Sequence, residues 1–268
     1  MPELPEVETV LRTLEHQIKG REILSVRVLY KPIVADDPKQ FASRLQNQHF
    51  CEFRRRGKYL LFYMDDVLLV SHLRMEGKYY LQHDSEPIDK HIHVIFQLDH
   101  NLQLRYRDTR KFGRMELMPK DTDMNTFHNL GPEPFDDAFS PQYIKKYCRN
   151  RKEPVKTLLL DQHFTAGIGN IYADEILFAA GIKPSRRCCT LTVKNCTDIV
   201  NETRRILKAA ITAGGTTIRT YTSSLGVSGL FQLQCCVHEQ KICPECGSQI
   251  KMKWIGGRSS YYCARCQK

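Results

Sequence analysis

Four cysteines near the C-terminus constrain the fold of this chain more than any other feature. Cys243 and Cys246 are separated by two residues, as are Cys263 and Cys266, and sixteen residues lie between the two pairs. Four thiolates at this spacing suit one tetrahedral zinc ion with a structural role, because no coordination position stays open for catalysis. The alternative is a chance spacing or a redox pair.

The segment between the cysteine pairs predicts a β-hairpin. Residues 250–255 and 260–262 are typical of two strands, and residues 256–258 would form the turn at the apex. We therefore expect a β-hairpin zinc finger rather than a finger with a recognition helix. A hairpin held by zinc is a rigid way to present one arginine, Arg258, although an ordinary exposed turn arginine is the alternative.

The first half of the chain predicts a helix followed by strands. Apolar residues recur at intervals of three and four over residues 4–18, which is the helical period. After Gly20 the period changes to two, and short runs of β-forming residues alternate with turns. The predicted strands are residues 22–30, 49–54, 59–64, 67–73, 92–98, 102–107 and 112–118. Many short strands of this kind predict an antiparallel sandwich or flattened barrel.

The second half of the chain is predicted to be helical. Residues 119–141 are rich in Pro, Asp and Asn and are interpreted as a linker. Helices are expected over residues 155–163, 171–180 and 192–213. Asn170 follows a Gly-Ile-Gly tripeptide and is predicted to be the N-cap of the second of these helices.

The charge of the chain favours a nucleic acid or another anionic surface as its partner. Lys and Arg number 40 against 30 Asp and Glu, a formal net charge of +10. No apolar run approaches the about 18 residues that a membrane helix needs, and the N-terminus has no secretory signal pattern. We therefore expect a cytoplasmic protein that binds no membrane. Its eleven cysteines are an odd number and do not form a disulfide framework.

The first residues of the chain could carry covalent chemistry. If Met1 is removed, Pro2 offers a free secondary amine, which can attack an electrophilic carbon and form an iminium. An α-amino group titrates near pH ~7.7–8.0, so a useful fraction is neutral and nucleophilic at physiological pH. Glu3 and Glu6 lie beside this amine. The alternative is that they only complement the dipole of the helix that follows.

The opening Met-Pro-Glu-Leu-Pro-Glu-Val-Glu-Thr resembles that of bacterial formamidopyrimidine-DNA glycosylases, and the resemblance recurs along almost the whole chain. The related endonuclease VIII typically has Gly where this chain has Leu4. The resemblance implies a monomeric enzyme of base excision repair that acts on double-stranded DNA containing oxidised purines or abasic sites. Such an enzyme removes 8-oxoguanine and formamidopyrimidines and then cuts the strand by β- and δ-elimination, in a bacterial cytoplasm and at the nucleoid.

Fold class and domain boundaries follow from the pattern and the resemblance together. We expect an α+β protein of two domains: an antiparallel β-sandwich with a leading helix, then a helix-two-turns-helix bundle with a β-hairpin zinc finger. The predicted segments are the catalytic domain (1–118), the linker (119–141), the DNA-binding domain (142–234) and the zinc finger (235–268). The four cysteines are the ligands of one structural zinc ion, and no nucleotide cofactor is implied.

The resemblance also implies roles for individual residues. Pro2 is the nucleophile at the sugar C1′, and Glu3 handles protons there. Lys58, in an Arg-Gly-Lys-Tyr-Leu sequence, assists catalysis. Arg258 binds the phosphate of the lesion and supports elimination.

Seven further residues are predicted to contact DNA. They are Met75, His91, Arg110, Phe112, Arg151, Lys156 and Asn170. Met75, Arg110 and Phe112 match the places whose residues, in the resembling family, enter the helix when the lesion is extruded, which costs a few kcal/mol of stacking. His91 and Asn170 would contact phosphates, while Arg151 and Lys156 belong to a basic cluster at residues 149–156. For Met and Phe the ordinary alternative is a core position, and for Arg a solvated one.

Two segments and two alternative functions remain open. Residues 215–229 correspond to the lesion-recognition loop of the family, whereas residues 234–240 depart from the Gly-containing tract usual there. One alternative function is excision of oxidised pyrimidines, as in endonuclease VIII. The other is a non-catalytic zinc-ribbon protein that only binds DNA. The sequence also leaves open which of Glu3 and Glu6 moves protons.

Overall fold

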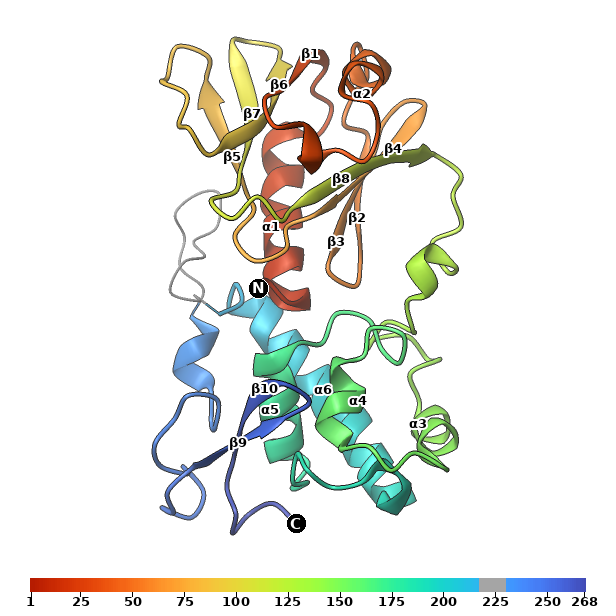
Figure 1. Cartoon of the computed structure of the whole chain (residues 1–268), viewed down its shortest axis with the longest axis vertical. Coiled ribbons are helices and arrows are strands. Elements are labelled where there is room, and N and C mark those ends of the chain that lie inside the picture. The colour runs from red at the N-terminus through yellow and green to blue at the C-terminus, as the bar shows by residue number, and fades with distance from the viewer. Residues whose placement is uncertain (217–229) are drawn as a thin grey trace. The chain divides into compact units, whose positions relative to one another are not determined.

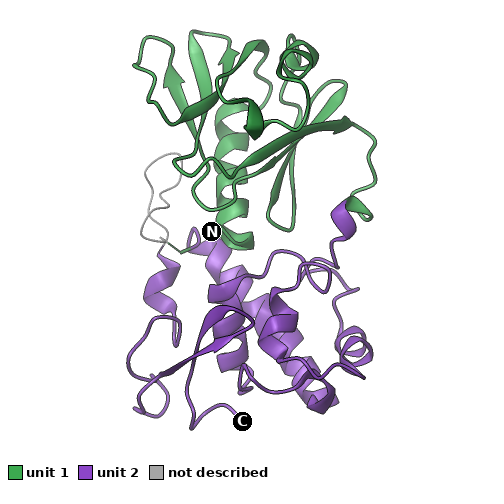
Figure 2. Ribbon diagram, viewed as in Figure 1, with its two compact units in different colours: residues 1–127, 216–229 green, residues 128–215, 230–268 purple. Residues whose placement is uncertain are grey.

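The computed structural model describes residues 1–216 and 230–268 (Figure 1). The chain divides into two compact units (Figure 2). Unit 1 comprises residues 1–127 together with Thr216, and unit 2 comprises residues 128–215 and 230–268. Each unit has its own secondary structure and is described by itself. In both described ranges, we find no helix whose length and hydropathy would allow it to cross a bilayer.

Unit 1 begins with the predicted helix, α1 (Leu4–Ile18). Its apolar stripe is buried, and Leu4, Leu14 and Ile18 have no exposed surface. The helix ends at Lys19, and Gly20 follows with a φ of 78°, a left-handed conformation that glycine adopts without strain. The helical period of the sequence therefore predicted both the length and the end of this element.

Two four-stranded antiparallel sheets make up the rest of unit 1. Their strand orders are β1-β6-β7-β5 and β2-β3-β4-β8. The first sheet consists of β1 (Ile23–Val28), β5 (Lys78–His83), β6 (Ile92–Leu98) and β7 (Leu102–Arg107). The second consists of β2 (Glu52–Arg56), β3 (Tyr59–Tyr63), β4 (Val67–His72) and β8 (Arg114–Pro119). All seven predicted strands are present.

Two elements of unit 1 were not predicted. Strand β5 lacks the alternation of buried and exposed residues that marks a strand, since its burial falls gradually from Lys78 to His83. It is held instead by its pairing with β7. Helix α2 (Pro38–Leu45) is only two turns long, and the Asp37 side chain caps it by accepting from two backbone N–H groups. A short 3-10 helix, η1 (Lys31–Ile33), precedes it.

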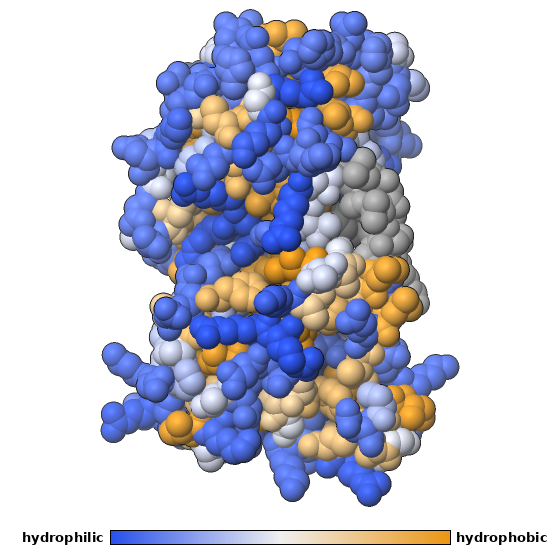
Figure 3. Space-filling model, turned by 180° about the vertical axis from the view of Figure 1, so that it is seen from behind, coloured by the Kyte–Doolittle hydropathy of each residue, from blue (hydrophilic) through white to orange (hydrophobic). Residues whose placement is uncertain are grey.

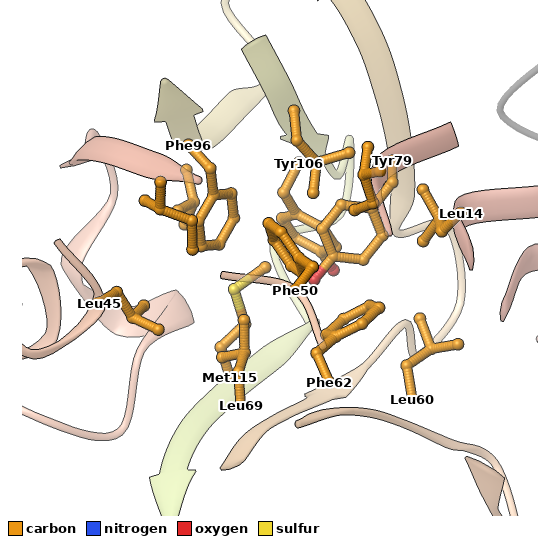
Figure 4. Close-up of a cluster of buried hydrophobic side chains, with 14 of the residues drawn as sticks. Leu14, Leu45, Phe50, Leu60, Phe62, Leu69, Tyr79, Phe96, Tyr106 and Met115 are labelled. Carbon is orange, nitrogen blue, oxygen red and sulfur yellow. The ribbon is translucent and has the colours of Figure 1, made fainter. Parts of the chain in front are cut away.

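The core of unit 1 joins α1, α2 and both sheets in one hydrophobic cluster (Figure 4). Aromatic rings dominate its centre, where the Phe50 and Phe62 rings meet edge to face at 5.9 Å and Tyr79 lies 5.9 Å from Phe62. Burial raises the pKa of Tyr79, and its hydroxyl donates to Ser71 at 2.8 Å. This core supports the loops at the strand ends, which carry the predicted site residues Lys58, Met75, His91, Arg110 and Phe112.

Unit 2 is helical with one small sheet. Its helices are α3 (Pro141–Cys148), α4 (Val155–Leu160), α5 (Asn170–Ala179) and α6 (Val193–Thr212), and its strands are β9 (Lys251–Ile255) and β10 (Arg258–Tyr262). Short 3-10 helices lie at η2 (Phe127–Asn129), η3 (Cys188–Thr190) and η4 (Phe231–Gln234). The sequence did not predict α3. Helix α4 ends three residues before the predicted position, because residue 161 adopts an extended conformation.

Helix boundaries in unit 2 follow from local capping. Thr192 and Asn195 form a capping box at the start of α6. At α5 the N-cap is Gly169, with an extended backbone, and Asn170 is already the first helical residue. The predicted N-cap role of Asn170 was therefore wrong by one position, which leaves its side chain available for another contact.

Candidate active site and metal centre

The start of α1 is buried and tightly hydrogen-bonded. Pro2 and Glu3 directly precede the helix, and Glu3 is only 3% exposed. The backbone N–H of Glu3 donates to Glu6 Oε2 at 2.8 Å. Glu6 Oε1 accepts from the backbone N–H of Thr216 at 2.7 Å and from its hydroxyl at 3.0 Å. Both oxygens of Glu6 are therefore used to hold backbone in place.

Lys58 lies on the turn between β2 and β3 and is 6% exposed. Gly57 makes this turn with a φ of 56°. The guanidinium of Arg55 donates to Glu8 of α1 at 3.1 Å and to the carbonyl of Gly57 at 2.9 Å. Arg55 thereby ties the turn that carries Lys58 to the first half of α1.

The loops that carry Met75 and Phe112 are joined to each other. Met75 lies in the connection from β4 to β5, and Phe112 lies in the connection from β7 to β8. The Thr109 hydroxyl of the second loop donates to the Glu76 carboxylate of the first. Phe112 is 49% exposed, and the Arg110 guanidinium lies 4.8 Å from its ring centre. The structure thus places an exposed aromatic ring beside a cation, on a loop that is hydrogen-bonded to the loop carrying Met75.

Asp108 holds the second loop in shape. Its carboxylate is fully buried and accepts from the backbone N–H groups of Arg110, Phe112 and Gly113 at 2.8–2.9 Å. Gly113 is needed because a Cβ there would lie 1.7 Å from the hydroxyl oxygen of the buried Tyr106. Neither residue was singled out from the sequence, since a lone Asp in a strand end carries no periodic signal.

His91 is half-buried just before β6. Its backbone N–H donates to Asp89 Oδ1 at 2.9 Å, and its carbonyl accepts from Asp108 at 3.0 Å. His93 is buried, with Nε2 2.8 Å from the Asp108 carbonyl oxygen. Within the described residues, the groups of side chains that could hold a metal include neither histidine.

The turn before α5 in unit 2 has a backbone that an external group can approach closely. Gly167 has a φ of 92°, and its N–H donates to Gln162 Oε1 at 2.9 Å. The amide nitrogen of Gln162 donates to the Ile168 carbonyl at 2.9 Å. Asn170 Oδ1 is buried, and no hydrogen-bond partner is found for it in the described part of the chain. The backbone N–H groups at this helix N-terminus are suited to an external anion such as phosphate, and the amide group of Asn170 carries two further N–H donors.

The two residues of the predicted basic cluster have different environments. Arg151 is exposed, 4.2 Å from the ring centre of Tyr147 and 3.0 Å from Glu153. Lys156 has no exposed surface. Its Nζ lies 2.7 Å from Asp174 Oδ1 and donates to the Ser259 carbonyl at 2.7 Å.

The DNA contact predicted for Lys156 stays a prediction. In the structure its ammonium group is enclosed between α4, α5 and β10 and ties the zinc hairpin to the helices. No local sequence pattern indicates this second role, since the partner residues lie far along the chain.

The four cysteines form one cluster, as predicted. Their Sγ atoms all lie within 4.8 Å of one another, with Cys243 and Cys266 3.8 Å apart and Cys246 and Cys263 3.5 Å apart. A tetrahedral site with Zn–S bonds of about 2.3 Å has sulfur–sulfur edges of about 3.8 Å. These thiols therefore fit one zinc ion.

The hairpin between the cysteine pairs has a tighter turn than predicted. Gly256 and Gly257 alone form it, both with positive φ, and Arg258 is the first residue of β10, paired with Ile255. The side chain of Arg258 is exposed beside the turn. A three-residue turn is excluded because the register of the two strands leaves only the two glycines unpaired.

Glu175 of α5 anchors the segment that leads into the finger. Its carboxylate accepts from the backbone N–H groups of Cys236, Val237 and His238 at 2.8–3.0 Å. Burial raises the pKa of Glu175, and the three N–H donors act in the opposite direction. The unusual residues 234–240 are thus held partly by backbone contacts to Glu175 and partly by the His238 side chain, whose Nδ1 lies 2.8 Å from Asp174 Oδ2.

Together these features define a two-unit zinc-finger protein that processes DNA. Residues 1–115 match the formamidopyrimidine-DNA glycosylase N-terminal domain, residues 130–222 match the formamidopyrimidine-DNA glycosylase H2TH domain, and residues 241–268 match the zinc finger found in FPG and IleRS. The chain belongs to the formamidopyrimidine-DNA glycosylase family. This confirms the resemblance predicted from the N-terminal motif, the α+β fold class and the single structural zinc ion.

Similar proteins cover the whole chain. Formamidopyrimidine-DNA glycosylase from Bacillus licheniformis is 45% identical, over 100% of both chains. A solved complex of Lactococcus lactis Fpg with DNA containing an abasic site has a TM-score of 0.93 and 37% identity, over 99% of both chains. A complex of the same enzyme with DNA containing an oxidised pyrimidine has a TM-score of 0.93 and 37% identity, over 100% of both. The chain is accordingly a base-excision-repair DNA glycosylase and lyase.

Proposed function

We propose that this enzyme excises oxidised purines from double-stranded DNA through an iminium formed by Pro2, and then cuts the strand. The observation that carries this proposal is the start of α1, where Pro2 adjoins the buried Glu3 and the backbone between them and the helix is fixed by Glu6. A nucleophile must be held in one geometry relative to its target to react efficiently. The buried capping of α1 supplies that fixed geometry.

The reaction begins with the amine of Pro2, after Met1 has been removed. Its lone pair forms a bond to C1′ of the everted nucleotide, while the glycosidic bond breaks and its electrons leave with the protonated base. The proline nitrogen then loses its proton, and the C1′–O4′ bond breaks as O4′ takes up a proton, so that C1′ becomes an iminium on an opened sugar. The iminium acidifies the C2′ proton, whose loss expels the 3′ phosphate. A second elimination expels the 5′ phosphate and completes the strand cut.

Glu3 is assigned the proton transfers and Glu6 the positioning. This assignment is supported by the hydrogen bonds of Glu6, whose two oxygens accept from Glu3 and Thr216. Proton transfer requires a group within reach of the sugar, and Glu3 adjoins the nucleophile directly. Lys58 assists as proton donor or phosphate ligand, and Arg258 binds the lesion phosphate.

The remaining site residues are assigned to DNA. Met75, Arg110 and Phe112 fill the space left by the extruded nucleotide, and the hydrogen bond that joins their two loops in unit 1 supports this role. Phosphates are contacted by His91, Arg151 and Asn170. The zinc ion, when bound by the four cysteines, stabilises the hairpin and supplies no step of the reaction.

The functional division of the chain is also a proposal. We assign catalysis to residues 1–118, the connection to residues 119–141, helix-two-turns-helix DNA binding to residues 142–234 and the zinc finger to residues 235–268. Residues 217–229, most of the predicted lesion-recognition loop, lie outside the described residues. The enzyme is proposed to act as a monomer in the bacterial cytoplasm, at the nucleoid.

Borohydride trapping tests the mechanism. Protein whose Met1 removal has been verified by mass spectrometry is mixed with a duplex containing 8-oxoguanine, and borohydride reduces any iminium to a stable adduct. Wild type should form the adduct at Pro2, located by peptide mapping. Glu3→Gln should lose base excision but still form an adduct on a preformed abasic site. Pro2→Gly retains a primary amine, so a reduced yield is expected.

Two outcomes would overturn the mechanism. Full activity with Met1 still attached would exclude the amine of Pro2, because the proline nitrogen would then be an amide. The absence of an adduct from correctly processed protein would favour a protein that only binds DNA.

Excision of oxidised pyrimidines is the second candidate, and the complex of the Lactococcus lactis enzyme with such DNA is the observation that favours it. Leu4 supports the purine assignment, because endonuclease VIII typically has Gly there. Rates on matched duplexes that differ only in the lesion decide between them. Faster excision of 8-oxoguanine and formamidopyrimidines is expected.

A further inference from the structure

The zinc hairpin carries an exposed apolar face that the proposed mechanism does not use. Met252 and Trp254 of β9 are 51% and 67% exposed. They are two residues apart on a strand, so their side chains point to the same face. Exposed apolar residues also occur elsewhere on the surface, and the face drawn in Figure 3 mixes hydrophilic areas with several apolar patches. Trp254 is the single tryptophan of the sequence.

The hairpin is fixed through its other strand. Strand β10 packs against α5, and its backbone is held by Lys156 at the Ser259 carbonyl and by Asp174 at the Tyr261 N–H. At the tip, a Cβ on Gly256 would lie 2.8 Å from Thr157 Oγ1, so the turn rests on α4. Strand β9 is therefore the outer strand, and within the described residues its sheet partner is β10.

The outer strand alternates cations with apolar side chains. All of residues 251–254 are exposed, in the order Lys-Met-Lys-Trp. Lysines on a sheet edge oppose the addition of a further strand, and like charges oppose a second copy of this chain. Basic side chains interleaved with an aromatic ring are instead the combination that binds nucleic acid, because cations contact phosphates and the ring contacts sugars or bases.

We propose that Met252 and Trp254 form an additional DNA contact, in which the indole packs on a deoxyribose or an unstacked base. Lys251 and Lys253, whose side chains start from the opposite face of the strand, add the positive charge that attracts phosphates. This contact lies on a different strand from Arg258 and is separate from the phosphate role of that arginine. The indole adds affinity that depends little on salt, because it carries no charge, whereas the lysines add a salt-dependent part. The partner of this contact is DNA and not a protein, since the flanking lysines favour a polyanion.

The single tryptophan makes the contact directly measurable. Zinc-loaded enzyme is titrated with a duplex containing a tetrahydrofuran abasic analogue, which cannot be cleaved, and the indole is excited selectively. Binding is followed in parallel by the anisotropy of a label on the DNA. We expect the emission of Trp254 to change on binding and its quenching by acrylamide to fall at least twofold, because the ring becomes covered. An emission spectrum and quenching that stay unchanged at full saturation of the DNA overturn the proposal.

Substitutions separate the apolar contact from the ionic one. Trp254→Ala should weaken binding roughly tenfold with an unchanged dependence on salt, and Trp254→Phe should restore most of the loss. Lys253→Ala should instead reduce the slope of log affinity against log salt by about 0.9. Leu233→Ala is the matched control, because Leu233 is 79% exposed on η4 and lies outside the hairpin.

Zinc content per chain is measured for every variant, so that loss of the hairpin is recognised. Trp254→Ala protein with full zinc content and wild-type affinity at all salt concentrations overturns the proposal. A loss of affinity equal in Trp254→Ala and Leu233→Ala does so as well, because it would reflect general surface hydrophobicity. Neither result would affect iminium formation by Pro2.

Discussion

The carboxylate of Glu6, in the first turn of α1, accepts a 2.7 Å hydrogen bond from the backbone N–H of Thr216, a residue 210 positions further along the chain. Both groups are buried, with exposures of 2% and 4%. The same side chain holds the N–H of Glu3. One carboxylate thus connects the start of unit 1 to Thr216, the second residue of the predicted lesion-recognition loop.

Glu6→Gln should destabilise unit 1, because an amide has one acceptor oxygen where the carboxylate uses two. A buried donor left unsatisfied costs about 1–3 kcal/mol, and the free energy of unfolding should fall by this amount. Urea denaturation followed by circular dichroism measures it. Glu15→Gln is the control, since Glu15 forms only an exposed pair with Lys19 and should change stability by less than about 0.5 kcal/mol. Equal effects of the two substitutions would contradict the positioning role of Glu6.

Asp108→Asn should disturb the loop that carries Arg110 and Phe112. The carboxylate accepts three backbone N–H bonds, and the amide nitrogen of Asn would face one of those donors. We expect a loss of about 1–3 kcal/mol in stability and weaker discrimination between lesion-containing and undamaged duplexes. Competition binding with the two duplexes measures the discrimination. Asp121→Asn, at an exposed position of unit 1, should leave it unchanged.

Lys156→Met should destabilise unit 2 by about 3 kcal/mol, because it leaves Asp174 Oδ1 buried without its cation, while Asp174 Oδ2 keeps its contacts to His238 and to the Tyr261 N–H. Arg151→Ala should leave the stability nearly unchanged. It should instead reduce the slope of log DNA affinity against log salt concentration by about 0.9. Thermal unfolding and salt titrations of both variants check this. A Lys156→Met variant with wild-type stability and only a reduced salt dependence of DNA binding would show that Lys156 contacts DNA directly, as the sequence predicts.

Glu175→Ala should loosen the path into the zinc finger, because three backbone N–H groups lose their acceptor. We expect zinc to be released to a chelator about tenfold faster, which corresponds to a loss of about 1.4 kcal/mol, and a chromogenic indicator follows the release. Glu202→Ala is the comparison, since Glu202 pairs with the exposed Arg205. Unchanged release from the Glu175 variant would show that the cysteines alone hold this segment.

Much of the site could be predicted because its signals are local. The four-cysteine spacing predicted the metal centre, since two ligands with two residues between them on a tight turn are already close in space. The helical period located α1, and alternation located seven of the eight strands of unit 1. The N-terminal motif indicated the family, which the full-length relatives confirm. Strand β5 and helix α3 were missed because neither presents a clear period.

What the sequence alone determined is therefore the set of elements, the zinc ligands and the family to which the chain belongs. The tertiary structure decided which charged groups remain available at the surface. It buried Lys156 against Asp174, engaged both oxygens of Glu6 and made Asp108 a support for the Phe112 loop. The physical reason is that the cost of burying a charge or a donor depends on partners brought close by folding, and these partners lie too far along the chain for any local pattern to record.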